Sequence, residues 1–199
     1  MKFYHNGITQ PNQNYRLFNS RSLDECHLLW GDICGYGWSR RNQRVEVEVK
    51  STKERQTYYG ALDYLSKRFI VQEYSAGNED NTIEFLKYLQ SLAEESTRWI
   101  IIWDGASYHR SHKVKEFLAQ LNSGRPEEEW KMTLVRLAPN APEQNPVEDV
   151  WLQAKQFVRK YARMCKKFKS VKLLFGLVTH LQTFAFPKAF MYGYCSCPI

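Results

Sequence analysis

Residues 98–109, RWIIIWDGASYH, pass from five large apolar residues directly to a single acid. The run from Trp99 to Trp103 is rich in isoleucine and bounded by a charge and a glycine, which predicts a central strand buried on both faces of a sheet. Asp104 follows at once, so its carboxylate is expected at the carboxyl end of the strand, where open α/β sheets place their chemistry. A turn that begins at Asp104 before Gly105 explains the same residues. Whether Asp104 belongs to a turn or to a functional site therefore depends on whether other acidic residues are expected near it.

The composition indicates one globular domain. Of the 199 residues, 43% are hydrophobic and 25% are charged, unlike disordered or collagen-like chains. Lys and Arg outnumber Asp and Glu by 28 to 21, and this net charge of +7 favours polyanionic partners such as nucleic acid. Five scattered cysteines without a paired CxxC spacing argue against a disulfide framework or a zinc site and favour a reducing cytoplasm. No stretch approaches an apolar membrane span, so we expect no membrane partner.

The order of the predicted elements is that of a mixed sheet. Strands are expected at residues 18–28, 57–65 and 68–74 as an antiparallel meander, and the valines alternating with glutamates at 45–49 indicate a hairpin. Helices are then expected at 78–93, 111–121 and from 145 onward, with strands at 99–103 and 131–137 between them. We therefore predict an α/β fold with a mixed five-stranded sheet, an antiparallel meander followed by parallel strands, and helices on both faces.

Glu148 lies at the predicted start of a helix. In NPVEDVW, Asn145 is a good N-cap, Pro146 suits the first helical position, and Glu148 falls three residues after the cap, as in a capping box. An acid there stabilises the first turn by about 0.3–1 kcal/mol, which is a sufficient structural reason for Glu148. A helix that starts next to the end of the central strand would also bring Glu148 toward Asp104, and Asp24 on the first strand could face both.

Asp24, Asp104 and Glu148 would repel one another at such a site and raise each other's pKa unless cations neutralise them. Only one of Asp24 and Glu25 can face the site, because neighbouring side chains of a strand point to opposite faces. Oxygen ligands suit Mg²⁺ or Mn²⁺, and two ions about 3.5–4 Å apart can activate an attacking oxygen and stabilise the leaving oxygen of a phosphodiester. Asp149 and Glu25 remain alternative ligands, since each adjoins one of the three acids.

Three blocks of sequence, LDECHLLWGD, WIIIWDGASYHRS and LAPNAPEQNPVEDVWLQAK, resemble the signature blocks of the mariner-type DDE transposases, most closely the branch of bacterial insertion sequences. The resemblance runs in order over residues 17–183, and the last block is the most specific. It implies a ribonuclease-H-like fold in which Asp24, Asp104 and Glu148 are the three acids that bind two Mg²⁺ or Mn²⁺ ions. His109 matches a histidine often seen in the second block, and packing at a helix start explains it equally well.

The resemblance implies a metal-dependent DNA endonuclease and polynucleotidyl transferase. It would cleave DNA strands with water and join them through a 3′-hydroxyl, without a covalent protein–DNA intermediate. Expected partners are the double-stranded DNA of transposon ends and target, and a second copy of the chain in the synaptic complex, in the cytoplasm at the bacterial nucleoid. Fewer than two dozen residues precede Asp24, too few for the family's helix-turn-helix module, so a separate polypeptide could supply it. An inactive remnant that only binds DNA, or a nuclease without strand transfer, remains an alternative.

The chain is expected to comprise a flexible arm (residues 1–17), the ribonuclease-H-like DDE catalytic domain (18–185) and a C-terminal tail (186–199). Basic residues at the hairpin tip and along the last helices are candidate DNA contacts, although a solvated helix face explains the helical ones equally well. Contact with backbone phosphates would make DNA affinity fall steeply with salt. The candidates are Arg40, Arg41, Arg44, Lys155, Arg159, Lys160, Arg163, Lys166 and Lys167.

Overall fold

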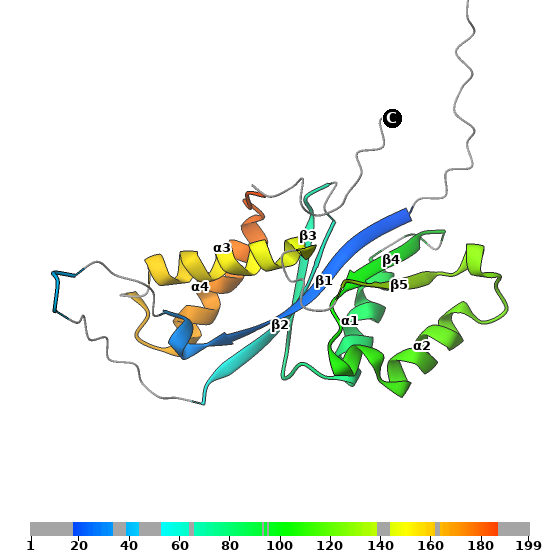
Figure 1. Ribbon diagram of the computed structural model, residues 1–199, viewed down its shortest axis with the longest axis horizontal. Coiled ribbons are helices and arrows are strands. Elements are labelled where there is room, and N and C mark those ends of the chain that lie inside the picture. Colours follow the sequence, from blue (N-terminus) through cyan, green and yellow to red (C-terminus); the bar gives the residue numbers. More distant parts are fainter. Residues whose placement is uncertain are drawn as a thin grey trace, which may run out of the picture.

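A five-stranded sheet forms the centre of the molecule, and helices pack on both of its faces (Figure 1). The computed structural model describes residues 18–33, 39–43, 53–63, 66–92, 94, 96–138, 144–161 and 164–186. The strands are β1 (Phe18–Leu29), β2 (Arg55–Leu62), β3 (Phe69–Tyr74), β4 (Arg98–Trp103) and β5 (Met132–Arg136). The α-helices are α1 (Glu79–Ser91), α2 (His112–Asn122), α3 (Pro146–Lys160) and α4 (Phe168–Leu181). Short 3₁₀ helices are η1 (Trp30–Ile33), η2 (Ser107–Arg110) and η3 (Glu127–Glu129).

The strand order is β3-β2-β1-β4-β5, with β1 at the centre. β1 pairs antiparallel with β2 and parallel with β4, while β2 and β3 are antiparallel and β4 and β5 are parallel. This is the predicted mixed sheet of an antiparallel meander followed by parallel strands. The predicted hairpin strand at 45–49, the arm at 1–17 and residues 187–199 of the tail lie outside the described residues.

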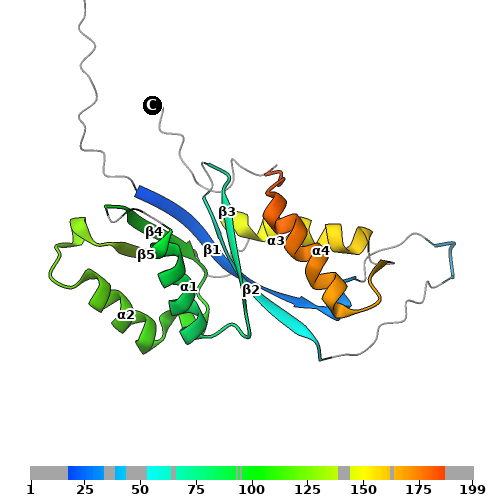
Figure 2. The same ribbon diagram turned by 180° about the vertical axis from the view of Figure 1, so that it is seen from behind.

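The alternation of side chains along β1 divides the core into two clusters. Cys26 and Leu28 point to the cluster built with α3 and α4, whereas Leu23 points to the cluster built with α1 and α2. Figure 2 shows the molecule from behind, with α3 and α4 again on one side of the central strands and α1 and α2 on the other. The next two residues, Asp24 and Glu25, therefore point to opposite faces of the sheet.

β4 is fully buried on one face only, so the expectation of a strand buried on both faces is wrong. Trp99, Ile101 and Trp103 are buried against α1 and α2, but Ile100 and Ile102 are half-buried. The reason is where the helices on the other face lie, because α3 packs on β1 and β2 and α4 packs on β3. Within the described residues, the core cluster on that face includes no side chain of β4 or β5. The carboxyl end of β4 is thus left open beside α3.

Gly60 determines how closely α3 can approach the sheet. It lies directly opposite Asp24 in the pairing of β1 with β2. A Cβ atom at this position would lie 2.5 Å from Trp151 Cζ2 on α3 and 2.5 Å from Phe69 Cζ on β3. The Trp151 ring instead lies against the bare backbone and meets the Phe69 ring edge-on, with 5.2 Å between ring centroids. Glycine in a strand interior here marks a close approach of another element.

The structure describes two of the five cysteines. Cys26 and Cys165 are buried free thiols, and the remaining three cysteines lie outside the described residues. No helix in the described part of the chain is both long and apolar enough to cross a membrane.

The role of Gly60 can be tested with a pair of identical substitutions. Gly60→Ala should destabilise the fold by about 1–3 kcal/mol, because the new methyl group displaces Trp151 from the sheet. Gly176→Ala is the matched control, since Gly176 lies in α4 with no atom within 4 Å of the added Cβ. Helix propensity predicts that this control gains up to about 1 kcal/mol. Urea unfolding measures both, and equal stability of the two variants would contradict the proposed close approach.

Candidate active site

Asp24 and Asp104 lie at the same level on neighbouring parallel strands. The pairing of β1 with β4 runs from Phe18 opposite Arg98 to Ser22 opposite Ile102. A further step of two residues on each strand leads to Asp24 and Asp104. A step of two preserves the face of a strand, so both acids continue the face on which α3 lies. The predicted placement of Asp104 at the carboxyl end of a sheet strand is therefore confirmed.

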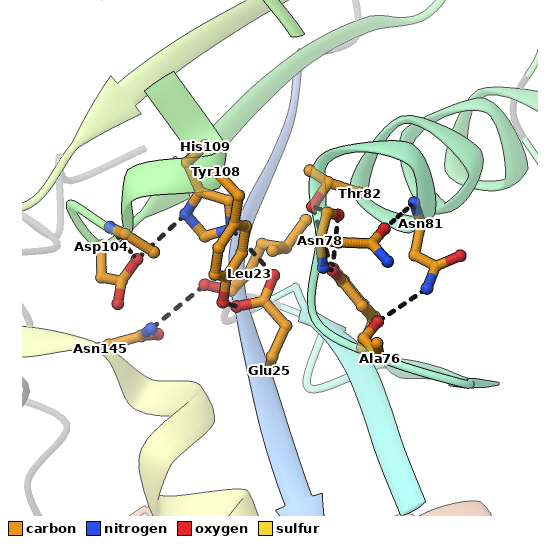
Figure 3. Close-up of polar contacts among 12 residues, drawn as sticks. Leu23, Glu25, Ala76, Asn78, Asn81, Thr82, Asp104, Tyr108, His109 and Asn145 are labelled. Atoms are coloured by element: carbon orange, nitrogen blue, oxygen red, sulfur yellow. Dashed lines mark hydrogen bonds and ion pairs between the residues drawn. The ribbon is translucent and has the colours of Figure 1, made fainter. Parts of the chain in front are cut away.

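Asn145 connects the start of α3 to β1. Its Oδ1 accepts a hydrogen bond from the backbone N–H of Val147 at 3.2 Å, which confirms the predicted N-cap. Its Nδ2 donates to the carbonyl oxygen of Leu23 at 3.2 Å (Figure 3). The residue is only 3% exposed. Because Leu23 directly precedes Asp24, and Glu148 lies in the turn that Asn145 caps, one buried amide fixes these two acids relative to each other.

Asp24 is the most perturbed acid of the site. It is 7% exposed, and burial raises the pKa of its carboxyl well above the ordinary value. The charges of Glu148, Glu25 and Asp104 raise this pKa further, while a backbone hydrogen bond at Glu25 opposes them. Desolvation and like charges both disfavour the ionised form of an acid. Asp24 is thus a buried acid that lies within electrostatic reach of both other predicted site acids.

Glu148 is an exposed acid in the first turn of α3. Partial desolvation raises the pKa of its carboxyl, Lys155 opposes this increase, and the charges of Asp104 and Asp149 add to it. The three predicted acids therefore interact electrostatically, as the sequence suggested. Asp149, an alternative ligand from the sequence, is next to Glu148 on the helix and also contributes negative charge.

Glu25 is held on the opposite face of β1 and does not join the three acids. Its side chain is 4% exposed, and its Oε1 lies 2.8 Å from Nε2 of His109. Its Oε2 accepts a hydrogen bond from the hydroxyl of Tyr108 at 3.0 Å. Both carboxylate oxygens are therefore occupied by side chains of η2, as Figure 3 shows. Glu25 is in consequence a poor candidate for an alternative metal ligand.

His109 also contacts Asp104. Its Nδ1 lies 3.0 Å from Asp104 Oδ1, but off the direction of a straight hydrogen bond, so the contact is an ion pair. Burial by itself would lower the pKa of His109, and the contacts with Asp104 and Glu25 raise it to about 9. The imidazole is thus a cation at neutral pH. Contact with His109 in turn lowers the pKa of the Asp104 carboxyl, with a smaller contribution from the backbone N–H of Ala106.

The donor set of the three acids fits a hard divalent cation. Carboxylate oxygens are the ligands that Mg²⁺ and Mn²⁺ prefer, and a cation would relieve the repulsion that raises the pKa of Asp24 and Glu148. The Asp104 side chain is 52% exposed, so it is accessible to an ion from solvent. In the described part of the chain, however, no group of three or more Asp, Glu, His or Cys side chains is arranged to hold one metal ion.

The basic residues proposed to contact DNA fall into three groups. Lys155 lies 3.4 Å from Asp32 Oδ2 and donates to the carbonyl of His27, so it ties α3 to β1 and η1. Arg159 donates to the carbonyl of Asp32 and ties α3 to η1. Arg44 and Arg163 lie outside the described residues. The remaining candidates are exposed: Arg40, Arg41, Lys160, Lys166 and Lys167.

Three features of the site carry no local signal in the sequence. The contact of His109 with both Glu25 and Asp104 depends on η2 folding back over β1, and nothing in the local pattern around His109 indicates those partners. Gly60 lies opposite Asp24 only because of the register between β1 and β2, which the sequence leaves open. Asn145 was predicted as a cap, but its second hydrogen bond to Leu23 joins residues far apart in the chain.

The opposite pKa changes of Asp24 and Asp104 predict opposite effects on stability. The folded-state pKa of Asp24 is raised, so its contribution to stability is present below its ordinary value and is lost as pH rises through the folded value. Asp24→Asn should therefore increase the free energy of unfolding at pH 7, without metal, by more than about 1 kcal/mol. Urea unfolding at pH 4 and pH 7 in EDTA measures the effect, which should shrink at pH 4.

Asp104→Asn is the control of opposite sign. The folded-state pKa of Asp104 is lowered, so its contribution is present above the ordinary value and is lost as pH falls. This variant should be less stable than the wild type at pH 7 under the same conditions. If both substitutions destabilise the protein equally at pH 7, the electrostatic description of the site is wrong.

Comparison with known proteins identifies the family. Residues 20–172 match the model of the DDE superfamily endonucleases. A solved structure of the Mos1 transposase paired-end complex with left transposon end is similar, with a TM-score of 0.56 and 13% identity over 87% of this chain and 50% of that one. A structure of the simian T-cell lymphotropic virus intasome in complex with PP2A regulatory subunit B56 gamma is also similar. Its TM-score is 0.55 and its sequence identity 11%, over 92% of this chain and 58% of that one. A search of curated protein sequences finds no match.

These structural likenesses concern the fold, and the chain spans about half the length of the Mos1 chain that it matches. They agree with the predicted ribonuclease-H-like arrangement of a mixed five-stranded sheet with helices on both faces. The assignment to the bacterial insertion-sequence branch remains a prediction. Since the family model covers most of the sequence, including all three predicted acids, the chain belongs to the DDE superfamily of endonucleases.

Proposed function

We propose that this chain is the catalytic domain of a transposase, which cleaves DNA strands and transfers them to new positions with the help of two Mg²⁺ or Mn²⁺ ions. The observation that carries the proposal is that Asp24, Asp104 and Glu148, from three distant parts of the sequence, lie within electrostatic reach of one another. The charges of Glu148 and Asp104 raise the pKa of Asp24, and the charge of Asp104 raises the pKa of Glu148. Membership in the DDE superfamily endonucleases supports the reaction class. The Mos1 match, solved with a transposon end, supports DNA as the substrate.

Asp24, Asp104 and Glu148 would hold the metal ions. Asp24 is central because it is coupled to both other acids, so it would serve both ions together with Asp104, while Glu148 completes the second set of ligands. Two bound divalent ions supply activation of an attacking oxygen and stabilisation of the leaving oxygen at a phosphodiester. Glu148 is exposed in the first turn of α3 and its carboxyl is affected by the charge of Asp104, so its side chain is free to adjust when an ion binds.

The residues of the chain itself position these acids. Asn145 holds the first turn of α3 on β1, and Gly60 lets Trp151 bring the helix close to the sheet. Asp24 lies within β1 and Asp104 directly follows the last residue of β4, so the sheet limits their movement and favours a fixed spacing of the ligands. We propose that this rigid support, together with the loss of repulsion on metal binding, makes the site specific for divalent cations.

The exposed basic residues are the proposed contacts to DNA backbone phosphates. Arg40 and Arg41 lie in a turn closed by the Gln43 N–H to Arg40 carbonyl hydrogen bond, with Asn42 in the left-handed conformation. Lys160 is at the end of α3, and Lys166 and Lys167 precede α4. Figure 1 places the turn and this end of α3 toward the same end of the molecule. Lys155 and Arg159 are less suited, because their side chains already bind other parts of the fold.

A second copy of the chain in a synaptic complex, and a separate polypeptide with a helix-turn-helix, remain part of the proposal. The Mos1 match is to a paired-end complex, which supports the pairing of two DNA ends. The present chain spans about half of that protein's length, so recognition of specific ends is proposed to depend on residues beyond this domain.

The central test of function is the substitution Glu148→Gln. It keeps the size and hydrogen-bonding ability of the side chain at an exposed position, so the fold should be retained. Loss of the carboxylate should reduce Mg²⁺-dependent strand cleavage of supercoiled or pre-cut DNA by at least about a hundredfold, since a metal ligand is removed. Gel assays of cleavage and of strand-transfer products give the result, and circular dichroism checks the fold.

Asp149→Asn is the matched control, because it changes the neighbouring acid of the same helical turn. We expect this variant to retain cleavage. Retained cleavage in Glu148→Gln with loss in Asp149→Asn would reassign the ligand. Cleavage without any joined product would indicate a nuclease, and a wild-type chain that binds DNA but neither cleaves nor binds Mn²⁺ would indicate an inactive remnant.

A further inference from the structure

His109 connects two acids that belong to different faces of the sheet. Its Nε2 lies 2.8 Å from Glu25 Oε1, and its Nδ1 lies 3.0 Å from Asp104 Oδ1. Glu25 follows Asp24 directly in β1, and Asp104 follows the end of β4. One imidazole ring thus spans the two strands that carry Asp24 and Asp104.

The ring of His109 has little freedom to move. The residue is 4% exposed, and its ring is stacked on the Trp103 ring with 4.2 Å between centroids and 3° between the planes. Tyr108 contacts it edge-on at 4.6 Å and donates its hydroxyl hydrogen bond to the same Glu25 carboxylate. Packing therefore fixes the plane of the ring, and Glu25 fixes the rotation within that plane.

The contacts of Asp104 are concentrated on one of its oxygens. Oδ1 receives both the ion pair with His109 and a hydrogen bond from the backbone N–H of Ala106 at 2.9 Å. Among the described residues, no hydrogen bond or ion pair involves Oδ2, and half of the side chain is exposed. The carboxylate is thus oriented through one oxygen while the other stays accessible.

We propose that His109 is a positioning residue, which through its two ring nitrogens links Glu25 to Asp104 and presents the second oxygen of Asp104 to a divalent ion. The part concerning the ion rests on the proposed function. If His109 served only in packing, its stacking on Trp103 would be explained. Packing alone would not explain why an acid lies at each of its two ring nitrogens. Outer partners of metal ligands commonly change metal affinity by 10- to 100-fold when they are removed.

Two amide substitutions separate the two contacts of the ring. In His109→Gln the amide nitrogen can replace Nε2, so buried Glu25 keeps a partner while the contact with Asp104 is lost. In His109→Asn the amide nitrogen can replace Nδ1, so the contact with Asp104 is kept while the one with Glu25 is lost. His112→Gln is the matched control, because His112 is exposed, lies three residues further on and pairs only with Glu116 among the described contacts.

The measurement is the binding of Mn²⁺ to the protein without DNA. The electron paramagnetic resonance signal of unbound Mn²⁺ monitors this binding, because the signal decreases as Mn²⁺ binds. We expect His109→Gln to weaken Mn²⁺ binding about tenfold with a moderate loss of stability from the broken contact with Asp104, and His112→Gln to bind like the wild type. His109→Asn should bind Mn²⁺ more tightly than His109→Gln, although it melts at a lower temperature. Wild-type affinity in His109→Gln would overturn the proposal, as would equal losses in both amide variants.

A metal-free measurement distinguishes failure of this link from failure of the proposed function. In EDTA, the unfolding of His109→Gln, Asp104→Asn and the double variant forms a cycle, and the double variant should lose less stability than the two single variants together. If the wild type binds no Mn²⁺ but the losses of stability are non-additive, the proposed metal-dependent function is wrong, while the proposed contact between His109 and Asp104 is supported. Additive losses show that His109 does not hold Asp104, whatever the metal affinity.

Discussion

The buried side-chain amide of Asn145 is the interaction on which the site depends. It caps α3 through Val147 and binds the Leu23 carbonyl of β1, so the helix start and the central strand become one unit. Gly60 and Trp151 also hold α3 near the sheet, because the absence of a side chain at Gly60 lets Trp151 of the helix lie against the strand backbone. An exposed acid on a helix and a buried acid on a strand are thereby brought within electrostatic reach.

β1 supplies an acid to each face of the sheet, and the two acids have different tasks. Asp24 lies on the α3 face among other acids, where burial and repulsion make its ionisation costly. Glu25 lies on the other face with both oxygens bound by His109 and Tyr108. The His109 ring then extends from Glu25 to Asp104, so both faces of β1 contribute to one group of ligands. A shift of β1 by one residue would exchange these roles and destroy the site.

Much of this arrangement could be predicted from the sequence. The apolar run before Asp104, the Asn145-Pro146 helix start and the alternation at Asp24 and Glu25 are local patterns, and local patterns determine strands, caps and faces. The open second face of β4 could not be predicted, because it depends on where α3 and α4 pack. The partners of His109 and the position of Gly60 also depend on register and on contacts between distant segments. They carry no local signal.

If Asp24, Asp104 and Glu148 form one site for divalent cations, an ion bound there lies next to three segments that are far apart in the sequence. Iron-directed cleavage of the backbone can detect this proximity. Fe²⁺ replaces Mg²⁺, and ascorbate with peroxide then produces hydroxyl radicals at the bound ion. We expect cuts next to Asp24, Asp104 and Glu148, suppressed by excess Mg²⁺ and absent in Asp24→Asn. Cuts confined to other segments, or cuts at these three that Mg²⁺ does not suppress, would contradict this expectation.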